Sequence, residues 1–372
     1  MNHQYFLYQG ERQQDQSIQS VLPSKCDIIQ GISAKHMPKI YNETLIIPQN
    51  GGVLTCLSLE TKEVIWEQTF SKDKSKWIDV FDLLVDNNNL FISIEDQLIK
   101  LNTDGKIIEQ YSLPTETIAN LKISHVHNQK FYSEFYSEED DQSYFFCYDL
   151  KSKSIIWKRL LKEDTTTSSA LYNDTLILNL SRNSLIALNL ITGDVIWQKN
   201  EFGSFTDEQH PSKTSKRPFG FPIIIDDILV NSLFGYTIIG IDLTTGTTKW
   251  ETKVDEKIPD SLICSANQDI FLIGNSTYCS IDSKNGKKIL EKNIGSDFLQ
   301  KGYIRQTFIN LSNDFIHFSD IDKGTFFIIN KNSGEVIWKY QCKSSIPLYH
   351  YPLITEKEIY LVDDKGNLYV FS

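Results

Sequence analysis

Histidines are the side chains of this chain best suited to bind a metal or to move a proton near neutral pH. His125 and His127 could place two imidazoles on one face of a strand, as a metal site requires. No third ligand stands nearby, so we interpret the pair as two partly solvated histidines that flank a turn. His210, His317 and His350 are isolated, and isolated histidines are more often structural or surface residues than ligands. The sequence therefore predicts no metal site.

Carboxylates are plentiful, but their positions favour turns over catalysis. Asp149, Asp242 and Asp282 each end an apolar run and precede a turn, where an Asx side chain accepts hydrogen bonds from its own backbone. No glycine-rich stretch has the strand-to-helix context of a phosphate loop, and no motif surrounds a serine or cysteine nucleophile. We therefore predict no catalytic residues and no cofactor-binding residues.

The cysteines occur singly inside apolar runs, with no Cys-x-x-Cys pair and no adjacent pair. This spacing favours buried, reduced thiols over disulfides or a zinc site. The six residues are Cys26, Cys56, Cys147, Cys264, Cys279 and Cys342.

The element that must position all of these side chains is a repeated β-hairpin. Its clearest copy runs from Leu185 to Asn200, LIALNLITGDVIWQKN. Leu185 to Asn189 is a short apolar run typical of a buried strand, Thr192-Gly193 is a turn in which glycine can adopt positive φ, and Val195 to Trp197 starts a second strand.

Copies of this hairpin recur along the chain at intervals of roughly 40 to 50 residues, which in an all-β sequence indicates propeller blades. Two copies depart from the pattern, because Glu109 and Leu290 stand where the others have tryptophan. The other five copies end at Trp66, Trp157, Trp197, Trp250 and Trp338.

Each copy is preceded by an Asn-, Asp- or Glu-rich turn and an apolar strand, and eight such preludes occur, the last at Thr355 to Val362. With one further strand ahead of each, every unit reads as four antiparallel strands, A to D. The eighth unit stops at Ser372, before its fourth strand. We therefore predict an all-β, eight-bladed β-propeller of four-stranded antiparallel blades, closed by the N-terminal strand Gln4 to Tyr8 pairing beside Leu368 to Phe371.

The strand, the Asx turn, Thr-Gly and the Trp four residues after the Gly resemble the tryptophan-docking repeat of the PQQ-like propellers. That family includes quinoprotein alcohol dehydrogenases and the lipoprotein propeller of the outer-membrane assembly machine. The resemblance covers essentially the whole chain and implies that the five repeat tryptophans pack between neighbouring blades. It also implies that the contacts at Glu109 and Leu290 are built differently. The dehydrogenases need a calcium-bound quinone and often a vicinal disulfide, and no Cys-Cys occurs here, so we expect no quinone.

The length and the net charge limit the number of domains and the classes of function that the chain can have. A propeller of eight blades uses all 372 residues, so we predict a single domain over 1–372. A net charge of −11 argues against nucleic acid, which is normally bound by a basic face. No apolar run is long enough for a membrane helix, and the first residues lack a signal-peptide pattern. The sequence therefore predicts a cytoplasmic protein that is monomeric apart from its partner.

Two insertions depart from the repeat and mark a candidate binding face. One is Asn200 to Gly220, between strand D of one blade and strand A of the next, and the other is Ser137 to Ser143, between strands B and C. Both connections emerge on the same face of a blade, and polar loops on one face of a repeat protein often bind partners. The candidate partner-binding residues are Glu138, Glu139, Asp140, Asp141, Asp207, Glu208, Lys213, Lys216 and Arg217, with Trp77 added because it follows the charged run Ser71 to Lys76.

These features predict a non-catalytic propeller that binds another protein. An acidic surface favours a basic partner, and an immunity protein that neutralises a basic, nuclease-like toxin fits this description by analogy. One alternative is an assembly or scaffold factor resembling the outer-membrane lipoprotein propeller. A second alternative is a quinone-dependent, dehydrogenase-like enzyme.

Overall fold

The fold is taken from a computed structural model, which describes residues 7–8, 22–32, 34, 37–49, 51–70, 80–86, 89–94, 97–113, 122–137, 139–161, 166–180, 184–200, 205–206, 214–215, 222–233, 237–255, 263–266, 268–274, 277–294, 309–347 and 350–372. Within these segments every regular secondary-structure element is a β-strand. No helix with the length and apolar character needed to cross a membrane is found among them.

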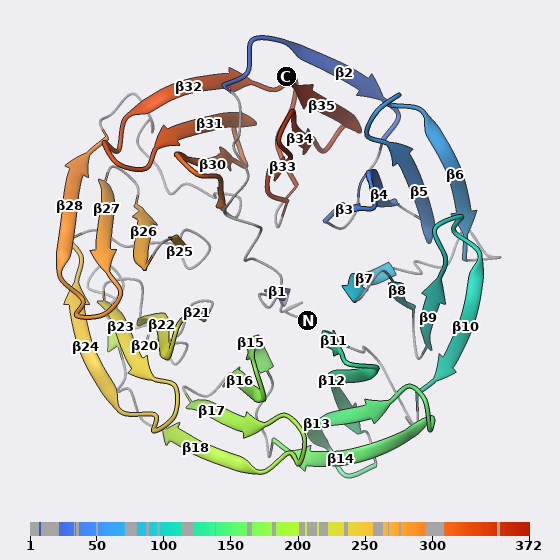
Figure 1. Ribbon diagram of the computed structural model, residues 1–372, viewed down its shortest axis with the longest axis vertical. Helices are drawn as coiled ribbons and strands as arrows, with labels where there is room; N and C mark the ends of the chain where they lie inside the picture. Colours follow the sequence, from blue (N-terminus) through green and yellow to red (C-terminus); the bar gives the residue numbers. More distant parts are fainter. Residues whose placement is uncertain are drawn as a thin grey trace. The chain divides into compact units, whose positions relative to one another are not determined.

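The strands pair antiparallel into eight four-stranded blades of an eight-bladed β-propeller, and in every blade except the last these strands are consecutive in the chain (Figure 1). The all-β, eight-bladed fold predicted from the repeats is thereby confirmed. We number the blades along the chain and give the bounds of their strands in the two paragraphs that follow.

Blades 1 to 3 follow one another within residues 39–160. Blade 1 comprises β3 (Lys39–Tyr41), β4 (Thr44–Gln49), β5 (Val53–Ser58) and β6 (Val64–Thr69). Blade 2 comprises β7 (Val80–Asp86), β8 (Asn89–Ile94), β9 (Gln97–Leu101) and β10 (Ile107–Ser112). Blade 3 comprises β11 (Lys122–His127), β12 (Lys130–Ser137), β13 (Gln142–Asp149) and β14 (Ser154–Leu160).

The later blades use the same antiparallel order. Blade 4 comprises β15 (Thr166–Tyr172), β16 (Thr175–Leu180), β17 (Ser184–Asn189) and β18 (Val195–Asn200). Blade 5 comprises β21 (Ile223–Ile225), β22 (Ile228–Leu233), β23 (Thr237–Asp242) and β24 (Thr248–Lys253). Blade 6 comprises β25 (Ile263–Ala266), β26 (Asp269–Ile273), β27 (Thr277–Asp282) and β28 (Lys288–Asn293). Blade 7 comprises β29 (Asn310–Leu311), β30 (Phe315–Asp320), β31 (Thr325–Asn330) and β32 (Val336–Gln341). Blade 8 comprises β33 (Leu353–Ile354), β34 (Ile359–Val362), β35 (Asn367–Phe371) and β2 (Cys26–Gln30).

By their contacts the residues divide into two compact units. One unit contains Lys25–Glu163 and Tyr360–Phe371, and we call it the N-terminal unit because most of its residues come from the first half of the chain. The other contains Met1–Ser24, Asp164–Ile359 and Ser372, and we call it the C-terminal unit because most of its residues come from the second half. The single domain predicted over 1–372 stays a prediction.

The middle strands of each blade form the core, and the fourth strand is half exposed. In blade 4 nearly every residue of β16 and β17 is buried, whereas β18 alternates between exposed and buried positions. Strands that are apolar on both faces are stable only when both faces are covered, and neighbouring blades supply that cover. Trp197, Ile224 and Ile239, for example, share one apolar cluster that joins blades 4 and 5.

The turn between the third and fourth strand is held by its Asx side chain. In blade 4, Oδ1 of Asn189 accepts hydrogen bonds from the backbone N–H of Ile191 at 2.9 Å and of Thr192 at 3.0 Å. The acidic counterparts do the same, since Oδ1 of Asp149 accepts from Ser152 N–H at 2.6 Å. Asp242 and Asp282 likewise accept bonds from the backbone of their own turns. The prediction that these three aspartates form turns is confirmed.

The repeat tryptophans dock on the turn of the next blade. Trp66 Nε1–H donates to Thr103 O at 2.9 Å, Trp197 Nε1–H to Leu243 O at 2.7 Å, and Trp250 Nε1–H to Ser283 O at 2.8 Å. Each acceptor follows the Asx residue of its turn. The docking that the family resemblance implied is therefore present at these three tryptophans. Trp157 and Trp338 contact aromatic rings of their own blades, Tyr132 and Phe145 in one case and Phe326 and Tyr340 in the other.

At Glu109 an ion pair and a hydrogen bond take the place of the tryptophan contact. Glu109 pairs with Lys153 Nζ at 2.8 Å and accepts a hydrogen bond from Tyr111 Oη–H at 2.7 Å. Lys153 stands in the blade 3 turn at the place that glycine occupies in the parent repeat, with φ of 55°. Because no tryptophan ring covers this turn, a side chain is tolerated there, and it pairs with the residue that replaced the ring.

The contact at Leu290 uses a different strand. Tyr278 on β27 donates its hydroxyl hydrogen to Lys331 O, which follows the Asx residue of the blade 7 turn. Its ring covers Gly334, where an added Cβ would lie 2.5 Å from Cδ1 of Tyr278. The prediction that these two departures are built differently is confirmed, although the sequence did not indicate which residues would replace the tryptophans.

The prediction of which N-terminal residues close the ring is wrong. β2 (Cys26–Gln30), not Gln4 to Tyr8, pairs with β35, with Ile28 opposite Tyr369. Within the predicted stretch, β1 (Leu7–Tyr8) pairs in parallel with β15. The outer strand of a blade is half exposed, so the polar and apolar mixture of CDIIQ suits it, and β2 lies just before β3 in the chain, where a short connection suffices.

Candidate functional site

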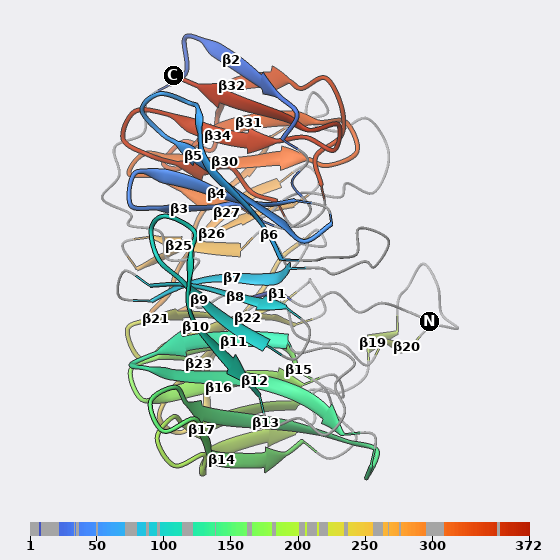
Figure 2. The same ribbon diagram turned by 90° about the vertical axis from the view of Figure 1, so that its right-hand side faces the viewer.

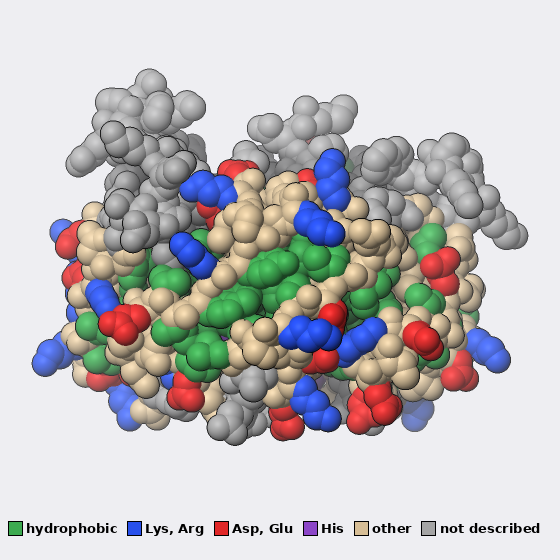
Figure 3. Space-filling view, turned by 90° about the horizontal axis from the view of Figure 1, so that it is seen from above, with side chains coloured by type: hydrophobic (Ala, Val, Ile, Leu, Met, Phe, Trp, Pro, Cys, Tyr) green, Lys and Arg blue, Asp and Glu red, His purple; other side chains and the backbone are tan. Residues whose placement is uncertain are grey.

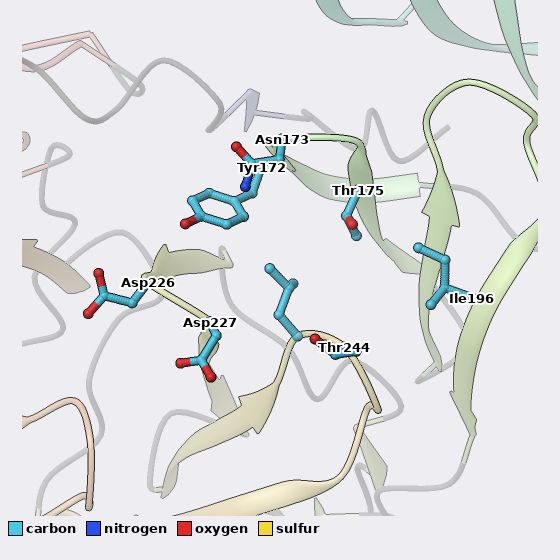
Figure 4. Close-up of a pocket in the computed structure, with 8 residues that line it drawn as sticks. Tyr172, Asn173, Thr175, Ile196, Asp226, Asp227 and Thr244 are labelled. Atoms are coloured by element: carbon cyan, nitrogen blue, oxygen red, sulfur yellow. The ribbon is translucent and has the colours of Figure 1, made fainter.

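A cleft of about 440 Å³ opens between blades 4 and 5 in the C-terminal unit (Figure 4). The turn between β15 and β16 and the turn between β21 and β22 form opposite sides of the cleft, while β18 and the turn after β23 complete it. The lining residues are Tyr172, Asn173, Thr175, Ile196, Asp226, Asp227, Leu243 and Thr244.

Local backbone geometry brings the polar groups to the rim. Asn173 and Asp226 have positive φ, 50° and 52°, a conformation that asparagine and aspartate tolerate best among non-glycine residues. Each begins a two-residue turn between antiparallel strands, because Tyr172 pairs with Thr175 and Ile225 with Ile228. Tight turns of this kind project Asn173, Asp226 and Asp227 into solvent.

The charges around the cleft form a small network. Lys249 Nζ lies 3.2 Å from a carboxylate oxygen of Asp227 and 3.0 Å from one of Asp242. The hydrogen bond from Lys249, together with backbone N–H groups of the turn, lowers the pKa of Asp242 to about 2. Asp226 accepts a hydrogen bond from Gln268 Nε2 at 3.2 Å. The cleft therefore combines an acidic rim with Tyr172 and Leu243, an arrangement suited to a polar or basic side chain of another molecule.

The Asp242 network predicts a pH dependence of stability. The pKa of Asp242 is about 2 when folded and roughly 4 when unfolded, so its stabilising effect is present above pH ~4 and is lost as the pH falls through ~2. We expect Asp242→Asn to be less stable than the parent by ~1 kcal/mol at neutral pH. This difference should shrink as the pH falls through ~2, because the protonated carboxyl of Asp242 is then uncharged, as the amide is at every pH. Urea unfolding of both proteins at the two pH values measures it, and an unchanged difference at low pH would refute the assignment.

The two histidines of the pair lie in different surroundings. His125 is buried, which corrects the expectation of partial solvation, and its burial lowers its pKa to about 3. Only His127 borders the turn, with Nε2 at 2.9 Å from Asn128 Nδ2. His317 is fully buried, has its pKa lowered to about 3 by that burial, and lies 3.1 Å from Ser312 Oγ. Among the described residues, no group of three or more His, Cys, Asp or Glu side chains could hold a metal ion.

The cysteines whose side chains are described are free thiols. Cys56, Cys147, Cys279 and Cys342 are buried, and burial raises the pKa of Cys147 and Cys279 to about 11. The prediction of buried, reduced thiols is confirmed for these four residues, and Cys26 is partly exposed.

Few of the predicted partner-binding residues can be placed. Glu139, Asp140 and Asp141 lie between β12 and β13, where Tyr144 Oη–H donates to Asp140 and Tyr136 Oη–H donates to Asp141. The bond from Tyr144 lowers the pKa of Asp140. Glu139 is exposed.

The remaining predicted residues lie outside the described part of the chain. Within the insertion Asn200 to Gly220, β19 (Phe205–Thr206) pairs with β20 (Thr214–Ser215) as a separate two-stranded sheet. That both insertions share one face stays a prediction. The residues that cannot be placed are Glu138, Asp207, Glu208, Lys213, Lys216, Arg217 and Trp77.

Exposed aliphatic side chains on the outer strands are a second feature that the sequence analysis missed. In blade 4 a β-bulge leaves Ile196 opposite no residue, because Val195 pairs with Leu188 and Trp197 pairs with Ala187. The bulge turns Trp197 inward and leaves both Val195 and Ile196 exposed. The same arrangement recurs at Ile65 of β6 and Ile108 of β10. Hydrophobic side chains also gather on the side of the molecule seen in Figure 3, which carries β2. The sequence signal was the aliphatic pair that precedes the tryptophan position.

Comparisons with known proteins agree with this architecture. Residues 14–292 match the family described as outer membrane protein assembly factor BamB. No curated protein matches the chain significantly. Among solved structures, BamB from Moraxella catarrhalis is 15% identical with a TM-score of 0.67, covering 94% of this chain and 100% of that chain. Sqt1 from Saccharomyces cerevisiae is 12% identical with a TM-score of 0.65, covering 95% and 99%.

A quinohemoprotein alcohol dehydrogenase from Comamonas testosteroni is similar as well, at 10% identity with a TM-score of 0.64, covering 92% of this chain and 74% of that chain. At such identities these structural similarities show the fold alone.

Proposed function

The chain belongs to the family of the outer membrane protein assembly factor BamB, and from this premise we propose that it binds another protein as an assembly or scaffold factor. The exposed aliphatic side chains on the outer strands carry the proposal. Val64, Ile65, Ile108 and Ile289 each expose more than half of their surface, and adjacent exposed apolar side chains such as Val64 and Ile65 are typical of protein interaction sites.

The cleft between blades 4 and 5 supports the same function. Asp226 and Asp227 at its rim would attract a basic side chain, and Tyr172 could contact the cation through its ring. The net charge of −11 would speed the approach of a basic partner. Neutralisation of a basic toxin is a narrower form of this function and stays a prediction, because charge indicates basic partners in general. The predicted cytoplasmic location and the predicted absence of catalysis stay predictions too.

Purification of the affinity-tagged chain from its native host tests the proposed function. We expect a second protein to be retained in a fixed ratio at physiological salt. Retention should weaken when Asp226 and Asp227 are both replaced by Asn, and it should not weaken in the matched variant Asp314→Asn, which changes an exposed turn of blade 7. If no protein is retained, a binding role would be untenable.

The acidic loop of blade 3 gives a second test. Charge reversal of Glu138, Glu139, Asp140 and Asp141 should slow association with a basic partner and flatten its salt dependence. Deletion of Ser204 to Lys216 tests the other insertion. Association rates from surface plasmon resonance at low and high salt measure the effect. If both variants bind the partner as the parent does, the loops are not part of the interface and the partner uses another surface.

A further inference from the structure

The outer strands of blades 1 and 2 expose four branched aliphatic side chains. Val64 and Ile65 on β6 are 53% and 55% exposed, and Ile107 and Ile108 on β10 are 43% and 55% exposed. In both strands a β-bulge produces the pair, because Ile65 and Ile108 stand at the shift in register. Exposed apolar side chains that are adjacent, as Val64 and Ile65 are, are typical of interaction sites, whereas single scattered ones are not.

The two strands are linked within the N-terminal unit. Trp66 of β6 donates its indole N–H to Thr103 O in the turn that leads into β10, and its ring covers Gly105. The bulged start of β10 therefore follows directly on the turn that receives β6. Both strands face the viewer in Figure 2. We call the outer sides of β6 and β10 together the β6–β10 surface.

No lysine or arginine occurs within β6, VIWEQT, or β10, IIEQYS. The outer strands of blades 3 to 7 each carry at least one, namely Lys158 and Arg159, Lys199, Lys249 and Lys253, Lys288 and Lys292, and Lys339. Lysines on an outer strand hinder another chain from pairing along it. The β6–β10 surface lacks this protection within its strands.

The charge that remains on β6 is negative. Glu63, directly before β6, and Glu67 within it are both exposed. Lys62, in the preceding turn, donates a hydrogen bond from Nζ to the hydroxyl oxygen of Tyr360 at 2.8 Å, and its ammonium group lies over the ring of Tyr360. Thr55 Oγ1–H donates to Glu67 Oε2 at 3.2 Å and fixes that carboxylate beside the strand.

We propose that the β6–β10 surface binds an extended segment of another protein in which branched apolar residues alternate with lysine or arginine. Its apolar side chains would cover the four aliphatics, and its cations would meet Glu63 and Glu67. Successive side chains of an extended segment point to opposite sides, so the apolar ones can lie on the aliphatics while the long, flexible lysine or arginine side chains between them turn back to reach the glutamates. A second copy of this chain is a poor occupant, because the net charge of −11 makes the copies repel one another. The inference rests on the proposed function and names the chemistry of the partner.

A labelled peptide of alternating valine and lysine is the probe for the first experiment. Fluorescence anisotropy should show binding to the parent protein and at least ~10-fold weaker binding to the double variant Ile65→Lys with Ile108→Lys, which introduces cations and removes apolar contact. The matched control is Ile156→Lys with Ile337→Lys, at the equivalent bulge positions of β14 and β32. It should bind within about twofold of the parent. Replacement of Ile65 and Ile108 by Thr serves as a second variant that keeps strand preference.

The charge contribution is tested in the same assay. Glu67→Gln should weaken binding several-fold at low salt, whereas Glu251→Gln, which also follows the repeat tryptophan, should not. A peptide of the same composition with its valines and lysines in two separate blocks should bind at least ~10-fold more weakly than the alternating peptide. Equal binding of the two peptides would mean unspecific charge attraction, and equal weakening by the matched control variants would place the contact elsewhere. Either result overturns the inference.

Photocrosslinking in the native host separates this inference from the proposed function. A photoreactive amino acid at Ile65 or Ile108 should crosslink to a partner segment that alternates between apolar and basic residues, as read by mass spectrometry. Crosslinks from Ile289 or Asp227 alone would leave the protein-binding function standing and overturn the β6–β10 surface. The absence of any crosslinked protein from all four positions would overturn both.

Discussion

Replacing Trp197 by alanine is expected to lower the free energy of unfolding by about 3–5 kcal/mol, the usual cost of truncating a large buried aromatic side chain. Trp197 is only 8% exposed, and its ring packs in the cluster that joins blades 4 and 5. Its indole N–H donates to Leu243 O at 2.7 Å. The alanine variant loses apolar burial, leaves a cavity and removes the donor to that carbonyl. Denaturant unfolding followed by far-UV circular dichroism measures the shift of the midpoint.

The adjacent residue provides the control for this prediction. Ile196 is 43% exposed, so Ile196→Ala should change the stability by less than ~1 kcal/mol. Should Trp197→Ala and Ile196→Ala unfold at the same denaturant concentration, Trp197 would not hold the two blades together.

Replacing Gly246 by alanine should destabilise the protein by about 2–5 kcal/mol through two separate effects. The backbone of Gly246 has φ of +72°, which is unfavourable for a residue with a side chain. An added Cβ would also lie 2.7 Å from Cδ2 of Trp197, so the ring that docks on this turn would be displaced. Thermal and denaturant unfolding of the variant measure the sum of the two effects.

Gly31 separates the backbone effect from the collision with the ring. Its φ is +87°, and an added Cβ would meet no atom within 4 Å, so Gly31→Ala should cost only the backbone part, roughly 1–2 kcal/mol. A double variant of Trp197→Ala with Gly246→Ala gives the same separation within one site. In the absence of the ring, Gly246→Ala should cost no more than Gly31→Ala. Strictly additive effects of the two substitutions would show that the ring and the glycine are not coupled.

These two predictions concern the part of the molecule that the sequence describes best. The spacing of the tryptophans, the Asx residues and the following glycines indicated both the four-stranded unit and the contact between units. The pattern is readable because each blade repeats one solution to one packing problem, namely covering the apolar face of a sheet with its neighbour. The sequence showed that Glu109 and Leu290 depart from the repeat, but it did not show which residues make the contacts in place of tryptophan. Lys153 pairs with Glu109, and Tyr278 takes the place of a tryptophan from a different strand.

The candidate sites were much less predictable. The cleft is made by two turns that are more than fifty residues apart, at Tyr172 and at Asp226, and each looks in the sequence like an ordinary hairpin turn. The exposed aliphatic pairs look like parts of buried strands, since only the bulge directs Ile65 and Ile196 to the outside. Conversely, His125 seemed suited to a partly solvated position, and the strand register buried it.

The sequence by itself determined the strand content, the eight repeats, the Asx turns and the residues that dock between blades. These features depend on interactions between near neighbours in the chain or on a pattern repeated many times. The spacing of residues along the sequence is therefore enough to predict them. Only the tertiary structure decided that β2 completes blade 8 and which residues replace the missing tryptophans. It also decided which aliphatic side chains remain exposed. Each of these depends on the partner that a strand or side chain meets across the fold, and one sequence holds no record of distances between residues far apart in the chain.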